Sequence, residues 1–121
     1  MQYLVQMRIV AGSRPASLAE GVAFFNEYIQ PTLKLCRELQ DRRKILAGGP
    51  ISGTIGLALI VQADSARELD DLIAGLPVWP QMETEVTPLT TFEDRALAIQ
   101  SRLSDAKRAG SEFSRKIGKT S

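Results

Sequence analysis

The sequence predicts a single α+β domain built on a four-stranded antiparallel sheet, with an additional C-terminal helix. Four short segments show the alternation or the apolar runs of β-strands, and three others carry apolar residues at steps of three or four, as amphipathic helices do. In chain order these elements read strand, helix, strand, strand, helix, strand, helix. A chain of 121 residues is long enough for one such domain with a buried core.

The first strand is predicted at residues 2–10, where the side chains alternate between two faces. One face carries Tyr3, Val5, Met7 and Ile9, and the other carries Gln2, Leu4, Gln6 and Arg8. A helix to about Arg42 follows, because Ser17 and Glu20 have capping-box spacing and helical apolar spacing comes next. Pro31 is expected to kink or interrupt this helix, since proline lacks the amide hydrogen that bonds back one turn.

The uncharged segment 45–63 has about the length of a membrane span, but it predicts a β-hairpin. Glycine, proline and serine gather in its centre, between ILA and GLALIV, as in a tight connection between two strands. The second strand of this hairpin is apolar on both faces, with Leu57, Leu59 and Val61 opposite Gly56, Ala58 and Ile60. An open apolar sheet face favours a partner, so we expect a homodimer or higher homo-oligomer that Leu59→Asp would break.

The second helix is predicted to begin at Ser65, which has Glu68 three residues later, and to end before Pro77. After the turn-forming segment 77–80, residues 82–89 alternate as a fourth strand. The resulting βαββαβ order is that of the ferredoxin-like fold, which places both helices on one face of the sheet.

A third helix is predicted beyond this domain. Thr91 can cap it, and its apolar stripe consists of Phe92, Ala96, Ile99, Leu103 and Ala106. We therefore expect three regions: a domain over 1–90, a helix over 91–110 that docks on a neighbouring subunit, and a flexible basic tail over 111–121.

The composition excludes several chemistries. With no histidine and only Cys36, the chain has no Ser-His or Cys-His pair, no internal disulfide and no Cys/His metal site, so we expect no metal. A net charge of +1 argues against a nucleic-acid partner. We expect a cytoplasmic protein, because the N-terminus has no signal-peptide pattern and the lone thiol suits a reducing compartment.

Polar candidates for a site lie on the first and the last of the four predicted strands. Glu83 and Glu85 share one strand face and could serve as an acid and a base, with Glu85 the candidate catalytic residue. A solvated strand edge or an ion pair with Arg8 is the alternative. Gln6 and Arg8 share a face of the first strand and could bind a ligand carboxylate or carbonyl, although structural pairing is equally open.

Trp79 lies in the rigid PVWP turn at 77–80. It could serve as a lid that binds ligand over a pocket, or it could anchor a subunit interface. Anchoring is favoured, because tryptophan is enriched at the energetic centres of interfaces.

The segment ELDDLIAGLPVWPQMETEVTPL, residues 68–89, resembles the C-terminal signature of the muconolactone isomerase family. The shared features are the Gly-Leu-Pro turn, the second proline three residues on and the closing Glu-Val-Thr-Pro-Leu, and the start MQYLVQM fits the same register. The resemblance covers residues 1–89 and implies a small dimeric α/β-barrel protein of aromatic-acid catabolism that works without a cofactor. Residues 47–50 also resemble the related YCII-like proteins, whose acid/base histidine has no counterpart here.

The resemblance also implies where an isomerase site would lie. The isomerases move a double bond within a lactone, using a glutamate on the first helix and a tyrosine and an asparagine on the third strand. The matching positions here are Thr32, Ile55 and Leu57, none of which can shuttle a proton. This substitution fits a pocket for a more apolar ligand, or a site converted to packing.

We therefore expect a protein that binds a small apolar or aromatic-derived molecule with Ile55 and Leu57, together with Gln6, Arg8, Glu83 and Trp79. Its reaction would be that of a divergent isomerase or lyase, and muconolactone isomerisation itself is not expected. The alternative is a non-catalytic binding or assembly module whose barrel face serves only oligomerisation.

Overall fold

The computed structural model describes the backbone of residues 1–120 and the side chains of residues 1–111. The chain forms two compact units, one spanning Met1–Leu89 and one beginning at Thr90. Within the described residues, no helix combines the length and the apolar character needed to cross a bilayer.

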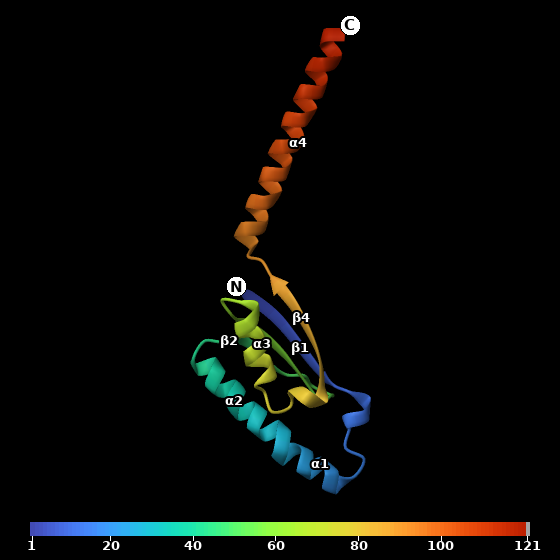
Figure 1. Ribbon diagram of the computed structural model, residues 1–121, viewed down its shortest axis with the longest axis vertical. Coiled ribbons are helices and arrows are strands. Elements are labelled where there is room, and N and C mark those ends of the chain that lie inside the picture. Colours follow the sequence, from blue (N-terminus) through green and yellow to red (C-terminus); the bar gives the residue numbers. More distant parts are fainter. Residues whose placement is uncertain (121) are drawn as a thin grey trace. The chain divides into compact units, whose positions relative to one another are not determined.

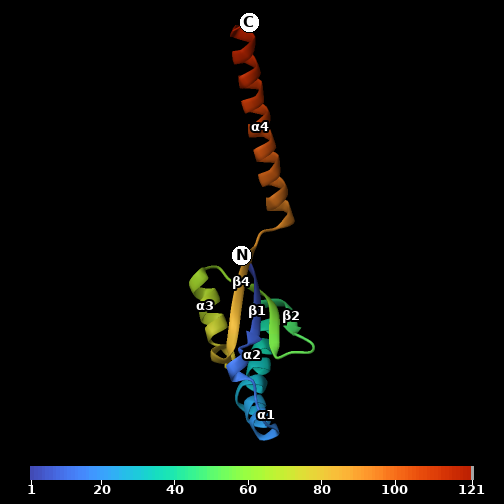
Figure 2. The same ribbon diagram turned by 90° about the vertical axis from the view of Figure 1, so that its right-hand side faces the viewer.

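The first unit is built on one antiparallel sheet with the strand order β2-β3-β1-β4. Its strands are β1 (Gln2–Ile9), β2 (Ile45–Pro50), β3 (Gly56–Gln62) and β4 (Met82–Leu89). Three helices, α1 (Leu18–Phe24), α2 (Gln30–Asp41) and α3 (Ala66–Ala74), cover one face of this sheet (Figures 1 and 2). The ferredoxin-like βαββαβ order expected from the sequence is therefore confirmed.

The core lies between the helices and the face of the sheet that they cover. Strands β1 and β3 contribute alternate residues to it, and α1, α2 and α3 supply the opposing apolar side chains. The buried members include Tyr3, Val5, Met7, Leu57, Leu59, Val61, Phe24, Leu39, Leu69 and Ile73. Because the strand period is two, the intervening residues of β1 and β3 face away from the helices. Leu59, with 4% of its surface exposed, is thus a core residue, so the expectation that Leu59→Asp would break an interface is wrong.

The predicted helix starts are confirmed by side-chain caps. Oγ of Ser17 accepts the N–H of Glu20 at 3.2 Å, and Oγ of Ser65 accepts the N–H of Glu68 at 3.1 Å. These bonds satisfy backbone donors that the first helical turn leaves without partners.

Pro31 interrupts the first long helix, as expected, and the interruption is a π-helical turn over Phe25–Ile29. The N–H of Gln30 bonds to the carbonyl of Phe25, five residues back, and α2 then begins with proline in its first turn. Proline is tolerated there because the amide that it lacks would have no helical partner. The π-helical turn is wider than an α-helical one, and it directs Phe25 and Ile29 toward the end of the sheet. Both residues line the pocket described below.

Edge strand β2 is irregular. Its pairing with β3 shifts between Ile45 and Ala47, and Gly48 has a φ of 110°. A Cβ at Gly48 would clash with the carbonyl oxygen of Ala58, so this position needs glycine for both its conformation and its space.

The second unit is the helix α4 (Phe92–Thr120). Oγ1 of Thr91 accepts the N–H of Asp94 at 3.0 Å, which confirms the predicted cap. The end expected at Gly110 is wrong, because the helix continues to Thr120, and so the expected flexible tail is helical up to that residue. An interior glycine costs a helix only about 1 kcal/mol, which does not suffice to end it. Ser121 lies outside the described residues.

Candidate ligand-binding pocket

A pocket of about 340 Å³ lies between the α1–α2 helical segment and the ends of β3 and β4. The helical segment contributes Phe24, Phe25, Ile29, Thr32 and Leu33, and the sheet side contributes Ile55, Gly56, Leu57 and Met82. Val78, from the turn before β4, completes the wall together with Pro15, Gly21, Pro50 and Thr54. A cavity of this size is in the range that small-molecule sites occupy.

The walls of this pocket carry no formal charge. Among the described residues that line it, none is acidic or basic, and Thr32 and Thr54 are the sole side chains with a polar atom. An ionised ligand buried here would lose its hydration without gaining a charged partner, which costs several kcal/mol. The pocket therefore favours uncharged molecules with large apolar surfaces.

Thr32 makes a structural hydrogen bond inside the pocket wall. It is 2% exposed, and its Oγ1 accepts the backbone N–H of Val78 at 3.0 Å. This bond fixes the turn before β4 against α2, and it uses the threonine as an acceptor of a buried amide. The hydroxyl therefore serves to hold one wall of the pocket in place.

The three positions implied by the isomerase resemblance meet in this pocket. Thr32 comes from α2, Ile55 from the end of the hairpin turn and Leu57 from β3, and all three line the same cavity. None of the three can donate and take back a proton at neutral pH, so the place that the resemblance implies for an isomerase site lacks proton-transfer groups here.

The polar candidates lie on the opposite face of the sheet. Gln6 and Arg8 pair across β1 and β4 with Glu85 and Glu83, respectively, and the four residues line a second hollow of about 310 Å³. Met7, between Gln6 and Arg8, is in the core and pairs with Leu57. The single site expected from the sequence is thus divided by the sheet, and Glu85 cannot touch a molecule held by Ile55 and Leu57 in the same subunit.

Trp79 lines neither hollow. It begins a short 3₁₀ turn (Trp79–Gln81) and is 40% exposed, whereas its neighbour Val78 is buried and faces the pocket. The role of a pocket lid is therefore not supported by its position, and the role of a subunit anchor stays a prediction.

Several pocket residues were not predicted from the sequence. Phe24, Phe25 and Ile29 belong to the same helical stripe as ordinary core residues, and Val78 and Met82 flank a turn. The available signal was Pro31, because a break in a helix rotates the residues before it and often marks a functional site. Phe24 also packs on Tyr28, with ring centroids 5.3 Å apart, which braces this part of the wall.

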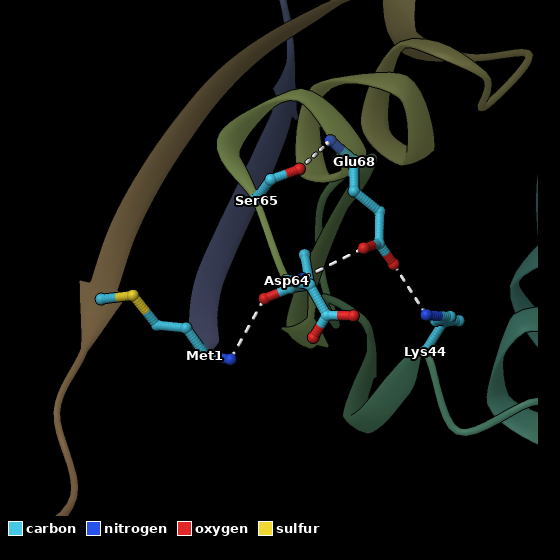
Figure 3. Close-up of polar contacts among 6 residues, drawn as sticks. Met1, Lys44, Asp64, Ser65 and Glu68 are labelled. Atoms are coloured by element: carbon cyan, nitrogen blue, oxygen red, sulfur yellow. Dashed lines mark hydrogen bonds and ion pairs between the residues drawn. The ribbon is translucent and has the colours of Figure 1, made fainter.

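The clearest ionic cluster lies away from the pocket, at the start of α3 (Figure 3). Nζ of Lys44 is 2.7 Å from Oε1 of Glu68, and the other carboxylate oxygen accepts the N–H of Asp64 at 3.1 Å. The hydrogen bond from Lys44 lowers the pKa of Glu68, and that bond in turn raises the pKa of Lys44. The N-terminal ammonium bonds to the carbonyl of Ala63 at 3.1 Å beside this cluster. These contacts tie α3 to the sheet.

Comparison with known proteins supports the family suggested by the sequence. The family model for muconolactone delta-isomerase matches residues 1–95 of the chain. The chain belongs to the muconolactone delta-isomerase family. No curated protein sequence matches it.

Solved structures similar to this chain share its fold. A crystal structure of muconolactone isomerase is 22% identical, with a TM-score of 0.62, and the match covers 75% of this chain and 90% of that one. The 5-chloro-2-hydroxyhydroquinone dehydrochlorinase TftG of Burkholderia phenoliruptrix AC1100, in complex with 2,5-dihydroxybenzoquinone, is 21% identical. Its TM-score is 0.51, and the match covers 78% of this chain and 98% of that one. Most of α4 lies beyond the residues that the muconolactone delta-isomerase family model matches.

Proposed function

We propose that this member of the muconolactone delta-isomerase family binds a small, uncharged apolar or aromatic-derived molecule in the pocket between α1–α2 and the sheet. The observation that carries the proposal is the uncharged lining of a 340 Å³ cavity, which includes the three positions where the resemblance implies the isomerase site. The two solved relatives support only the aromatic-derived part of this class, because their names refer to a lactone and to a hydroxylated aromatic compound, and one of them was solved with a quinone. The absence of charge on the ligand is argued from the lining alone.

The same lining argues for binding rather than for proton transfer. An isomerase or lyase that abstracts a proton needs a group whose pKa lies near the working pH, and the described residues around this pocket include none. An isomerase- or lyase-type reaction would need polar groups outside this lining, and the open face of the sheet offers one set of them. Glu85 stays the candidate base there, with Gln6, Arg8 and Glu83 beside it.

Self-association is the second part of the proposal. Leu4, Ala58 and Ile60 lie on the sheet face that α1, α2 and α3 leave uncovered, and all three are partly exposed. Packing two such faces together as a dimeric α/β barrel would remove this apolar surface from water. We place this homo-oligomer in the cytoplasm, on the ground of the lone cysteine.

Matched neutral and anionic ligands test the pocket. Methyl benzoate and benzoate share one ring, and we expect the neutral ester to raise the melting temperature while benzoate at the same concentration does not. At 100 times its dissociation constant the ester would add about 2.7 kcal/mol to the free energy of unfolding. Isothermal titration calorimetry would give the affinities.

A cavity-filling variant and a matched control locate the binding. Ile55→Trp should fill the pocket and abolish the response to the ester. Leu46→Trp, at an exposed position on β2 outside the pocket wall, should leave the response intact. Equal stabilisation by benzoate, or a full response in Ile55→Trp, would contradict the proposal.

A further inference from the structure

Helix α4 presents an apolar stripe that a helix in water cannot keep exposed. Its 29 residues extend over about 43 Å at the rise of an α-helix. Phe92 is 98% exposed and Leu103 58% exposed, and Ile99 is exposed as well. Most of the stability of such helices comes from packing an apolar face against a partner, so α4 needs an occupant for this stripe.

The spacing of the stripe identifies the kind of partner. Its members Phe92, Ala96, Ile99, Leu103, Ala106 and Gly110 follow one another at alternating steps of four and three, and the sequence continues the same steps with Phe113 and Ile117. This is the heptad spacing of a coiled coil, sustained over almost the whole helix. A helix that packs on a globular surface has a broader apolar face, so the pattern points to a second helix.

The sizes of the stripe residues identify the orientation and the occupant. In a parallel, in-register pair, Gly110 would face Gly110 and Ala106 would face Ala106, which leaves voids. In an antiparallel pair whose two-fold axis passes between Ser104 and Asp105, Leu103 lies level with Ala106, and Ile99 with Gly110. The same axis brings sequence position 113, a phenylalanine, level with Ala96.

The three inner levels each combine one large and one small residue, as an evenly filled seam requires, whereas the outermost level pairs Phe92 with sequence position 117, an isoleucine. We therefore infer that α4 forms an antiparallel coiled coil with α4 of a second copy of this chain. Over these inner levels the sequence of α4 is thus complementary to itself, which favours a second copy as the occupant.

The charged side chains beside the stripe oppose this pairing weakly. They also predict how the pairing depends on salt concentration. Arg95, Arg102 and Lys107 flank the seam, against the single acid Glu93. Two copies brought together therefore repel through these side chains, and added salt screens the repulsion. Self-pairing should thus become stronger with salt, whereas the binding of an acidic partner would become weaker.

Engineered cysteines in the full chain test the register. In a Cys36→Ser background, Ile99→Cys and Gly110→Cys are prepared separately, one with an affinity tag, and mixed under mild oxidation. In the antiparallel pair these two positions face each other, whereas the two copies of position 99 are about 16 Å apart along the axis. A disulfide requires Cα atoms within about 7 Å, so only the mixture should be linked.

Ser101→Cys, on the side of the helix away from the stripe, is the matched control. We expect the mixed disulfide dimer to exceed the control mixture at least tenfold, and its yield to rise between about 0.05 M and about 0.5 M salt. Self-linking of Ile99→Cys alone would show a parallel pair. No link, or equal links in the control, would show that another occupant or none covers the stripe. Any of these results, or a yield that falls with salt, would overturn the inference.

Discussion

The backbone N–H of Val78 donates a hydrogen bond of 3.0 Å to Oγ1 of Thr32, which lies 46 residues earlier in the chain. Both residues are buried, and both line the apolar pocket. At the position where the resemblance to the isomerases implies a catalytic glutamate, this protein thus has a residue that holds the pocket wall together.

Thr32→Val should test that structural role. The substitution keeps the shape of the side chain but leaves the buried amide of Val78 without an acceptor, so the free energy of unfolding should fall by about 1–3 kcal/mol. Urea denaturation would measure the loss, and Thr32→Ser, which retains the hydroxyl, should lose clearly less. An unchanged midpoint in Thr32→Val would show that the bond adds nothing to stability.

The protein should show little or no turnover of muconolactone. Removing one general acid or base typically lowers a rate by about 10²–10⁴-fold, and Thr32, Ile55 and Leu57 offer no proton-transfer group at the implied positions. An ultraviolet assay with the authentic lactone, run beside a known muconolactone isomerase, would measure this. Turnover at an ordinary enzymatic rate would mean that the reaction uses another part of the molecule, with Glu85 the first residue to substitute.

Two neighbouring residues of β3 should respond differently to the same substitution. Ile60→Asp places a charge on the uncovered face of the sheet, so it should reduce self-association while the subunit stays folded. Leu59→Asp places the charge in the core, at a cost of several kcal/mol, and should unfold the subunit. Sedimentation velocity and circular dichroism would separate the two effects. Unchanged association in Ile60→Asp would exclude the face-to-face dimer.

The ion pair between Lys44 and Glu68 should contribute to stability in a defined pH range. Because the pKa of Glu68 is lowered from 4.5 in the folded protein, its contribution is present above pH 4.5 and is lost as the pH falls through the lowered value. The raised pKa of Lys44 sets the upper limit of this pH range. The contribution of Lys44 to stability is fully present below pH 10.5 and is lost as the pH rises through the raised pKa.

Melting temperatures of Glu68→Gln measured across this range would check the effect. The variant should melt below the unmodified protein near pH 7 and approach it as the pH falls below the lowered pKa of Glu68, where the carboxyl is protonated in both states. Asp70→Asn, at an exposed position of the same helix, is the control. A difference that persists unchanged into acid would point to a cause other than the ionised carboxylate.

The fold was predictable from local patterns, whereas the site was not. The alternation in β1 and β3 and the caps at Ser17 and Ser65 depend on near neighbours in the chain, and both are confirmed. Whether Leu57 shares a face with Gln6 or with Met7 depends on the register between two strands, which is set by the tertiary structure. A one-residue difference in that register decides whether the candidate residues form one site or two.

The helices show the same limit. The break at Pro31 followed from its missing amide, but a kink, a gap and a π-turn are equally compatible with that sequence, and it is the π-turn that brings Phe25 and Ile29 to the pocket. The end of α4 was misplaced because Gly110 is a common stop signal whose small energetic cost a long helix tolerates.

The two outer strands limit how this protein can aggregate. On β2, the positive φ of Gly48 and the missing amide of Pro50 disrupt the row of donors that an incoming strand would need. On β4, the opposite edge, Pro88 and the exposed carboxylates of Glu83 and Glu85 oppose strand addition. Both margins of the sheet thus resist the edge-to-edge polymerisation that produces fibrils. Growth of this chain into larger particles is therefore directed away from the sheet edges and toward contacts in which sheet faces or helices meet.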